Sequence, residues 1–571
     1  MSNPSFPFDE NYSDDNFPLY KLVDDRSANF NGFFSSDNFG GGLDGLWSGN
    51  NFQPESPNVD VASFPASNDL QSLSEFTAFD DAHFNAVSTV IESLQIPAVT
   101  ATEDPERSSV PATSLHRSKE KSRQLDTEGT DDKQATIGAT VETGNALSTE
   151  EVVRIAAANF IQLSALVSGD PRKLGLPFGL SYSNLTSDEI KNVDLVCLLM
   201  TAADKLSKQQ FDRAEDLVRR CHVTSSRTGN PVQRVVHCFA DALQERIDRE
   251  TGKIPSKGSK GAEITTGEDV MKAILTNHSV HLIVNSTLPF TQVSQFTAVQ
   301  AVLDSMSTAK KIHLIDLSIK HGLQWAILMQ ALATRETCPI DSLKITAVGA
   351  LDEVVTIIGK RLSSFAESLN LPFEFRTVIV ADLKDLTVDM FDLEGGEELG
   401  IWSDLVMNSM LVNPEGLEKL MSVICKLNPR VMAVLDVEAG LNSRSFINRF
   451  TEALFYFSAF FDCLDDLMEP SDRSRMMIEG DFFSQGIKCI LAAEGSQRVI
   501  RQVGIRVWRS FFARFGLIET ELSESSLYQA RLILKKFVKD DSCTVQRNGN
   551  ALLTLWKGTP LHFVSAWKFR H

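Results

Sequence analysis

Apolar residues recur at helical intervals from residue 148 to about residue 300. The first run starts at Ser148-Thr149-Glu150-Glu151, which has the spacing of a capping box. It continues with the apolar residues Val152, Ile155, Ala156, Phe160 and Leu163. The same period predicts further helices over 188–203, 208–222, 231–250, 268–281 and 289–308. No segment here alternates as a strand would, so residues 148–300 are predicted to form a helical subdomain.

After residue 310 the pattern changes to short β-rich runs that alternate with helices. It predicts strands at 311–316, 343–348, 375–380, 404–408 and 430–437, and helices at 323–335 and 352–369. Strand-helix-strand units whose strands are of the buried type indicate a mostly parallel sheet with crossover helices. Near the C-terminus, the runs 552–556 and 561–567 flank Lys557-Gly558-Thr559-Pro560 and predict a closing antiparallel hairpin. Residues 301–571 are therefore predicted to form a Rossmann-like α/β core.

The first 147 residues show no sustained helical or strand period. Positions 1–150 contain 25 acidic and 8 basic residues, so −17 of the chain's net charge of −20 lies here. Such a segment is rich in Ser, Asn, Asp, Gly and Pro and buries too little apolar surface to fold, so we predict a disordered tail. Its first hundred positions interleave 15 acidic residues with 15 aromatic ones, which is typical of an activation-type interaction segment. A tail that only solubilises the protein is the alternative.

Two short segments of this tail have possible roles of their own. Residues 81–91 could fold as a helix on a partner. The basic residues Arg117, Lys119, Lys121 and Arg123 resemble an import signal, but Glu120 interrupts them and favours a solvated linker.

Cysteine spacing and hydropathy exclude several classes of protein. The eight cysteines include no C-x-x-C pair and no Cys/His cluster, which argues against a disulfide framework and against a zinc site. The N-terminus lacks the basic start and apolar run of a signal peptide, and no stretch of about 18 apolar residues occurs. We therefore expect a soluble intracellular protein.

The candidate chemistry lies after the first predicted strand. Asp316 ends this strand, and a turn containing Gly322 leads into a helix, which is where a doubly wound fold binds a ligand. With an acidic residue, Asp382, expected after a later strand and with the terminal hairpin, the sheet resembles that of S-adenosylmethionine-dependent methyltransferases. Their cofactor site needs clustered glycines, whereas this turn has one glycine among bulky side chains. The second strand also lacks a terminal acidic residue, so we expect no cofactor and no catalysis.

His313 lies within the first predicted strand, among apolar neighbours. A hydrogen-bonded core histidine is the favoured interpretation, and an acid/base role is the alternative. Asp316 is interpreted as a structural anchor for the turn that follows it.

At these residues the chain resembles the plant GRAS family of transcriptional regulators, over roughly positions 190–571. Ile312-His313-Leu314-Ile315-Asp316 is similar to the family's VHIID core, which continues in Gly322-Leu323-Gln324-Trp325. Residues 229–243 and 361–375 resemble the first and second leucine-heptad regions. The PFYRE region is expected around Pro429, Tyr456 and Arg501. The terminal SAW region is expected around Trp508, Trp556, Gly558 and Trp567.

The chain also departs from the family pattern. Where the family commonly reads Glu-Arg-His-Glu, this chain has Ile500-Arg501-Gln502-Val503, so an ion pair or partner contact made by the lost acidic residue does not carry over. The tail contains neither a DELLA string nor the VHYNP motif that accompanies it. The resemblance therefore implies a GRAS protein that is not of the DELLA type.

What the resemblance implies is a nuclear regulator, with the cytoplasm as a second location, that binds no membrane. It would act through DNA-binding transcription factors and through other GRAS proteins as homo- or heterodimers. The chain has no basic helix, zinc finger or basic zipper, so contact with nucleic acid is expected to be indirect. Two rival interpretations are a methyltransferase-like enzyme and a GRAS dimer that binds DNA directly. Leu195, Leu198 and Leu199 form an L-x-x-L-L string, which suits either a partner helix or a buried helix face.

Overall fold

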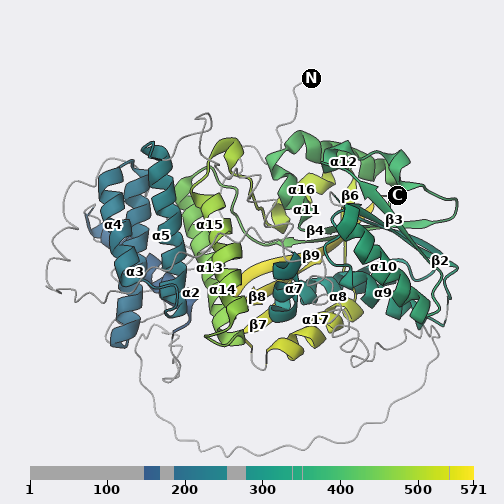
Figure 1. The fold of residues 1–571 in the computed structure, drawn as a ribbon, viewed down its shortest axis with the longest axis horizontal. Helices are drawn as coiled ribbons and strands as arrows, with labels where there is room; N and C mark the ends of the chain where they lie inside the picture. The colour runs from purple at the N-terminus through teal and green to yellow at the C-terminus, as the bar shows by residue number, and fades with distance from the viewer. Residues whose placement is uncertain are drawn as a thin grey trace, which may run out of the picture.

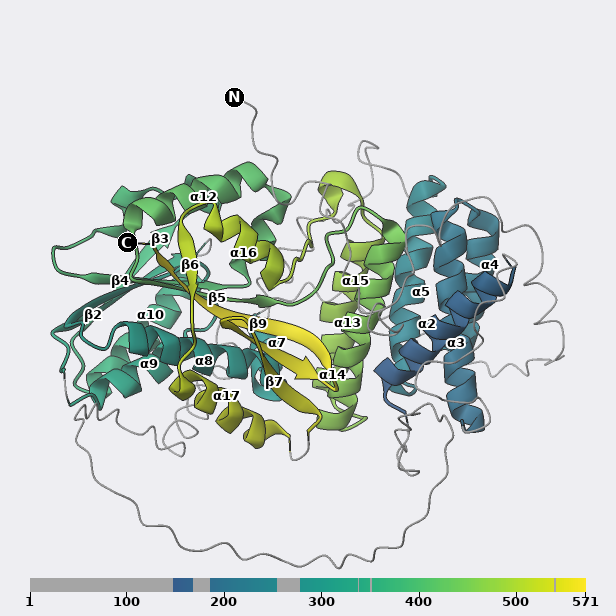
Figure 2. The same cartoon turned by 180° about the vertical axis from the view of Figure 1, so that it is seen from behind.

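The structure is a computed structural model of the chain. It describes residues 147–167, 185–253, 278–336, 338–349, 352–538 and 541–570. The tail predicted at 1–147, including its possible helix and basic cluster, lies outside the described residues except for Leu147. Figures 1 and 2 show the described parts as a bundle of helices at one end and a sheet covered by helices at the other.

The helical end, called the cap here, is assembled from two separate stretches of the chain. Its first stretch contains α2 (Thr149–Val167), α3 (Ser187–Ser207), α4 (Phe211–Thr224) and α5 (Pro231–Glu250). Its second stretch contains α13 (Phe446–Leu467), α14 (Arg473–Met477), the π-helical turn η8 (Ile478–Phe483) and α15 (Ser484–Leu491). The four helices predicted from residue 148 to residue 250 are confirmed. Because α13 and α15 pack against α5, the cap is not confined to residues 148–300 as predicted.

The start of α5 shows how local sequence and long-range contacts agree. Asn230 and Gln233 form a capping box around Pro231, which occupies the first turn and needs no N–H partner there. One residue later, the buried Arg234 donates to both carboxylate oxygens of Glu479, at 3.0 and 3.1 Å. It also donates to Asp465 of α13 at 3.0 Å. The first leucine-heptad motif thus carries the side chain that ties the two stretches of the cap together.

In the described residues the core sheet has nine strands. They are β1 (Lys311–Asp316), β2 (Ser342–Gly349), β3 (Phe373–Ile379), β4 (Glu398–Asp404), β5 (Val431–Val437), β6 (Leu517–Thr520), β7 (Cys543–Asn548), β8 (Ala551–Trp556) and β9 (Thr559–Phe569). Their order is β3-β2-β1-β4-β5-β9-β8-β7, and β6 pairs with β9. The pairings among β1 to β5 are parallel and those involving β6 to β9 are antiparallel. This confirms the predicted Rossmann-like, mostly parallel core.

Helices cover both faces of the sheet. One side holds α8 (Pro289–Ser305), which follows α7 (His278–Thr287), together with α9 (Leu323–Ala333), α10 (Asp352–Ser368) and α17 (Glu524–Phe537). The other side holds α11 (Val406–Ser409), α12 (Pro414–Leu427) and α16 (Ile505–Ala513). Leu314 and Ile315 are neighbours in β1 but belong to two different hydrophobic clusters, as the alternation of side chains along a strand requires. Because α8 packs on β5 and β9, the predicted boundary at residue 300 cuts through the core.

Three local predictions are wrong. The strand predicted at 404–408 instead ends at Asp404, where Leu405 takes a left-handed conformation with φ of 61° and α11 begins. Asp382 does not end a strand, since β3 stops at Ile379 and Asp382 caps a short 3-10 turn by accepting from the Lys384 N–H. The terminal hairpin does not form the edge of the sheet, because β9 lies between β5 and β8, and β7 is the edge strand.

Candidate functional site

Three aspartates lie at the carboxyl ends of adjacent parallel strands. Asp316 ends β1, Asp404 ends β4, and Asp436 is the last residue but one of β5. In the sheet, β2 and β3 lie on one side of β1, whereas β4 and β5 lie on its other side. The direction in which successive strands are added therefore reverses at β1, which makes this position the switch point of the sheet. In open α/β sheets the crevice at a switch point is the usual ligand site.

Asp316 uses its hydrogen-bonding capacity on its own surroundings. The side chain is fully buried; Oδ1 accepts from the Ser318 N–H at 3.1 Å. Oδ2 accepts from Gln324 Nε2 and from Trp325 Nε1, both at 2.9 Å. Burial raises the pKa of Asp316 to about 7, although these donors oppose the shift. Asp316 therefore anchors the turn and the start of α9 and offers no free oxygen to a ribose or a substrate.

Gly322 serves packing rather than ligand approach. Its φ is 76°, in the left-handed region that favours glycine. A Cβ at this position would lie 2.9 Å from Ile358 Cγ2 and 3.3 Å from Leu362 Cδ1, both on α10. The glycine lets the start of α9 approach α10. A methyltransferase would instead use glycines here to bring the backbone close to its cofactor.

His313 lies in a separate polar network farther back along β1. Its Nδ1 is 3.1 Å from Glu397 Oε2 and its Nε2 is 2.8 Å from Thr346 Oγ1. Glu397 also pairs with Lys344 at 2.6 Å. Burial lowers the pKa of His313 and keeps the ring neutral near pH 7. His313 is thus a hydrogen-bonded core histidine, three residues and about 10 Å along the strand from Asp316.

A cavity of about 180 Å³, called the cap cavity here, lies between the cap and the carboxyl edge of the sheet. The sheet contributes Asp404, Asp436 and His562, while the turn after β1 contributes Lys320 and His321. Cap residues form the opposite wall, including Tyr456 of α13 and Phe483 of η8. Of the residues singled out from the sequence, Tyr456 and Arg501 line this cavity.

Lys320 and the two aspartates of the cap cavity have polar partners within the protein. Lys320 Nζ lies 3.0 Å from Asp404 Oδ1. Burial alone would raise the pKa of Asp404, but the charge and hydrogen bond of Lys320 outweigh it and lower the pKa. Asp436 accepts from Asn408 Nδ2 at 2.7 Å and from the Val437 N–H at 2.8 Å. Burial nevertheless raises its pKa to about 6.

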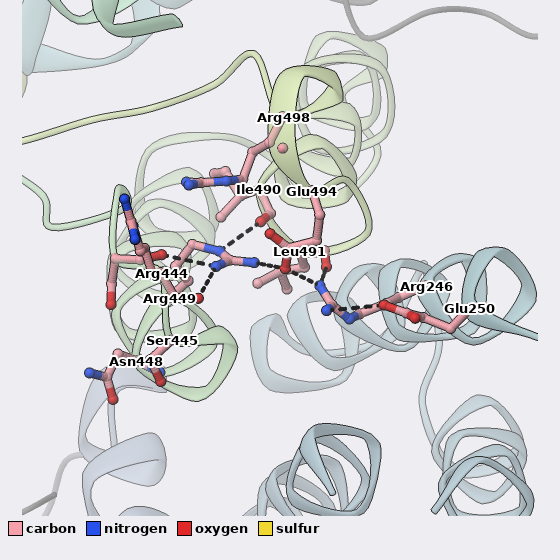
Figure 3. Close-up of polar contacts among 12 residues, drawn as sticks. Arg246, Glu250, Arg444, Ser445, Asn448, Arg449, Ile490, Leu491, Glu494 and Arg498 are labelled. Carbon is pink, nitrogen blue, oxygen red and sulfur yellow. Dashed lines mark hydrogen bonds and ion pairs between the residues drawn. The ribbon is translucent and has the colours of Figure 1, made fainter. Parts of the chain in front are cut away.

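Arg246 of α5, Arg449 of α13 and Arg498 of the segment after α15 lie near one another around Glu494 (Figure 3), and Arg501 follows in that same segment. The buried Arg449 donates to the carbonyl oxygens of Ser443 and Arg444 at 2.9 Å and pairs with Glu494. Arg246 of α5 pairs with the same Glu494 oxygen at 2.7 Å.

Arg501 itself donates to two carbonyls of its own segment and to Asn442 of the segment before α13. Its donors reach the Gly495 carbonyl at 2.7 Å, the Arg498 carbonyl at 3.1 Å and Asn442 Oδ1 at 3.4 Å. Arg501 therefore holds the turn that contains Glu494, and Glu494 bridges the two stretches of the cap.

The departure from the family string at 500–503 falls on the cavity wall. Ile500 and Gln502 line the cap cavity. Val503 is buried in the hydrophobic cluster on the α16 side, and its N–H donates to Asn408 Oδ1 at 3.0 Å. An apolar side chain therefore suits position 503, where the family commonly has an acidic one.

The remaining residues predicted as family motifs make contacts within the fold or form its turns. Trp325 packs edge-on against Trp402, with ring centroids 5.2 Å apart. Trp508 stacks on Phe512, which also contacts Trp567. The Trp556 Nε1 donates to Asp462 of α13 at 2.9 Å. Lys557 and Gly558 form the two-residue hairpin turn with φ of 43° and 90°, and the buried Pro429 follows the left-handed Asn428 that ends α12.

The L-x-x-L-L string lies inside the cap. Leu195, Leu198 and Leu199 of α3 are all buried, with exposures of 7%, 8% and 0%. They belong to the large hydrophobic cluster that includes residues of α2, α5 and α13. The structure therefore presents no exposed leucine face for a partner groove at this position.

Several cavity residues were missed from the sequence. Ser294, Lys320, Asp404, Asn408 and His562 come from four separate segments that meet only in the folded chain. The one signal available in the sequence was Asp404 at the end of β4. The predicted strand began six residues too late, at residue 404, so Asp404 was not recognised as a strand end. In the described residues no three His, Cys, Asp or Glu side chains gather as a metal site, and no helix is long and apolar enough to span a bilayer.

Comparison with known proteins identifies the family. Residues 195–568 match the GRAS domain family. This match covers more than half of the chain, so the protein belongs to the GRAS family, which confirms the resemblance found in the sequence.

Individual relatives agree with this assignment. The DELLA protein RGL1 of Arabidopsis thaliana is 30% identical over 377 residues, which cover 66% of this chain and 70% of that protein. Scarecrow-like protein 18 of the same plant is 31% identical over 405 residues, covering 65% and 90%. The DELLA protein GAI1 of Vitis vinifera is 29% identical over 389 residues, covering 67% of this chain and 63% of that protein.

A solved structure shares the fold. The crystal structure of SCL7 from Oryza sativa matches with a TM-score of 0.56 and 24% sequence identity. The match covers 66% of this chain and 99% of that one. At this identity it supports the architecture and nothing finer.

Proposed function

We propose that this protein is a nuclear GRAS-type regulator of transcription that acts mainly through contacts with other proteins. Its folded part binds DNA-binding transcription factors and other GRAS proteins, and its acidic tail recruits the transcription machinery. The protein is not of the DELLA type, since its tail has neither the DELLA string nor VHYNP.

One observation carries the choice of a regulator over an enzyme. At the switch point, where a methyltransferase-like sheet would hold its cofactor, Asp316 is fully buried and accepts three hydrogen bonds from its own chain. A cofactor hydroxyl finds no free carboxylate there. The cap cavity beside it, at about 180 Å³, is also smaller than the roughly 300–1,000 Å³ of most ligand pockets.

Indirect contact with DNA follows from the sequence patterns. The chain has no basic helix, zinc finger or basic zipper, and residues 151–571 carry a net charge of only about −3. Proteins that bind duplex DNA by themselves neutralise several phosphates with Lys and Arg, which makes their affinity fall steeply with salt. We expect the purified chain to show no such binding.

A tethering experiment tests this proposal. The full chain fused to an unrelated DNA-binding domain should activate a reporter, and the same fusion without residues 1–146 should activate it less. The unfused chain should bind the reporter promoter only when a DNA-binding partner is present. Calorimetry with S-adenosylmethionine should show no heat of binding. Saturable binding of S-adenosylmethionine, or salt-dependent binding of the purified chain to duplex DNA, would favour the enzyme or the direct DNA-binding dimer.

A further inference from the structure

The cap cavity has a shape and polarity that the regulatory function does not require. We propose that it binds an uncharged organic molecule of one or two rings that carries an N–H or O–H group. This inference goes beyond the proposed function, because contacts with transcription factors need no small ligand.

Size sets the class of ligand. The cavity volume of about 180 Å³ exceeds the roughly 150 Å³ of an engineered protein cavity that admits benzene. It falls short of the roughly 300 Å³ at which most drug-sized sites begin. A single ring or two fused rings fit this space, whereas a nucleoside does not.

Two residues that line the cavity each have a buried side-chain oxygen without a hydrogen-bond partner in the protein. Ser294 of α8 is 2% exposed and lines the cavity, and its Oγ makes no hydrogen bond. In the same helix, Thr297 and Ser305 donate back to the carbonyls four residues earlier. Gln502 also lines the cavity, and its buried Oε1 accepts no hydrogen bond. Unpaired buried polar atoms are costly, so a ligand N–H or O–H that reaches Gln502 Oε1 removes a penalty.

The charged side chains named on the cavity wall already make an ion pair or hydrogen bonds within the protein. Lys320 is paired with Asp404, and Asp436 accepts hydrogen bonds from Asn408 and Val437. Each guanidinium nitrogen of Arg501 already donates to the chain. Burial lowers the pKa of His562 to about 4, so its ring, stacked on Phe290, is neutral near pH 7. A charged ligand would therefore compete with these existing contacts, and an ion would pay for its desolvation.

The rest of the lining is apolar and comes from both layers. Leu288 and Leu435 lie on the sheet side, and Phe457, Phe460, Phe483 and Ile500 lie on the cap side. A ring between these walls would contact both, so it would stabilise the folded state by an amount that grows with the ratio of ligand concentration to Kd. Leu405, with φ of 61°, and the π-helical turn η8 also line the cavity, and such local irregularities are frequent at binding sites.

The test uses the full chain with two probes of the same shape. Indole has a ring N–H, and indene is the same bicycle without one. Isothermal titration calorimetry should show binding of both, with indene about tenfold weaker because it leaves Gln502 Oε1 unpaired. Indole-2-carboxylate, which carries a charge, should bind more weakly than indole.

Variants place the binding in this cavity. Gln502→Leu should bind indole and indene equally. The matched control is Gln529→Leu, because Gln529 on α17 also has a buried Oε1 without a partner but does not line the cavity. This control should keep the preference for indole.

Filling the cavity gives a second test. Gly486 lines it from within α15, and a Cβ there would make ordinary contacts at 3.6 Å with Phe457 and 4.0 Å with Ile500. Gly486→Ala should weaken indole binding severalfold without lowering the melting temperature, and Gly486→Leu should abolish it. The proposal is wrong if neither probe binds at millimolar concentration, or if Gly486→Ala and Gln502→Leu bind both probes as the wild type does.

Discussion

At the scale of single residues, Asp316 is the group whose titration should be visible in stability. Its pKa is about 7 in the folded protein because of burial, against about 3.9 when unfolded. Between about pH 4 and pH 7 the unfolded state loses this proton while the folded state keeps it. The contribution of Asp316 to the free energy of unfolding is therefore fully present below about pH 4. It decreases as the pH rises from about 4 to about 7.

Asp316→Asn removes this titration. Near pH 5 the variant should be less stable by about 1–3 kcal/mol, because an amide cannot accept all three N–H donors. By pH 8 the difference between wild type and variant should shrink by more than about 1 kcal/mol, since each unit of raised pKa corresponds to about 1.4 kcal/mol. Urea unfolding at pH 5, 6, 7 and 8 measures both. A difference that stays constant with pH would mean that Asp316 is ionised throughout.

An alanine at position 322 would lose stability for two reasons, a left-handed backbone conformation and a close contact with α10. Comparison with a second glycine separates these two effects. Gly322→Ala should destabilise the protein by about 1–2 kcal/mol for the left-handed conformation, plus the cost of the 2.9 Å contact with Ile358. The control is Gly396→Ala, where φ is 82° but no atom lies within 4 Å of the new Cβ. It should show the conformational cost alone in urea denaturation. Equal losses in the two variants would mean that α10 moves aside at no cost.

Prediction from sequence succeeded for residues whose role is local and failed for those whose role is spatial. Asp316 and Gly322 were found because they stand at a strand end and at a helix start. The partners of Asp316, Gln324 and Trp325, belong to the next helix, and the family resemblance marked them without explaining them. Ser294 and Gln502 could not be connected, because 208 positions separate them along the chain and only the packing of α8 under the cap places both at one cavity.

At the scale of elements, the periodic pattern was sufficient where a strand is buried on both faces. β1, β2 and β5 are buried along almost their whole length and were placed within a residue or two. β4 was placed too late because Gly400 interrupts its apolar run. In the structure this glycine leaves room for Leu314, since a Cβ at position 400 would lie only 2.7 Å from Leu314 Cδ2. β7 was missed because it is a polar edge strand with the sequence CTVQRN.

The terminal tryptophans should stabilise the two faces of the sheet independently. Trp556 belongs to the cluster that includes the cap, and Trp567 belongs to the cluster on the α16 side. Each Trp→Ala change should cost about 3–5 kcal/mol, and the costs should add in the double variant because the two side chains share no cluster. Chemical denaturation of the single and double variants measures this. A double variant much more stable than the sum would show that the two faces are coupled through β9.

At the scale of the whole molecule, the structural unit begins before the segment that matches the GRAS family. The match starts at residue 195, within α3. α2 lies upstream of it, yet its residues Val152, Val153 and Ile155 are almost fully buried in the main hydrophobic cluster. The Thr149 N–H also donates to Asp462 of α13 at 2.9 Å, and that same carboxylate accepts from Trp556. The start of the folded part is therefore tied to the C-terminal hairpin.

Two truncations that differ by residues 147–184, which include α2, should behave very differently. A chain that begins at Leu147 keeps α2 and should melt cooperatively close to the temperature of the full chain, because the tail is predicted to bury no core. A chain that begins at Leu185 loses three buried β-branched side chains, each worth about 1.5–3 kcal/mol, and leaves Asp462 without one of its donors. This loss is comparable with the total stability of about 5–15 kcal/mol of a typical domain, so the shorter chain should aggregate or melt far lower. Calorimetry and light scattering distinguish the two cases. A shorter chain that stays monomeric and melts like the longer one would show that the cap is complete without α2.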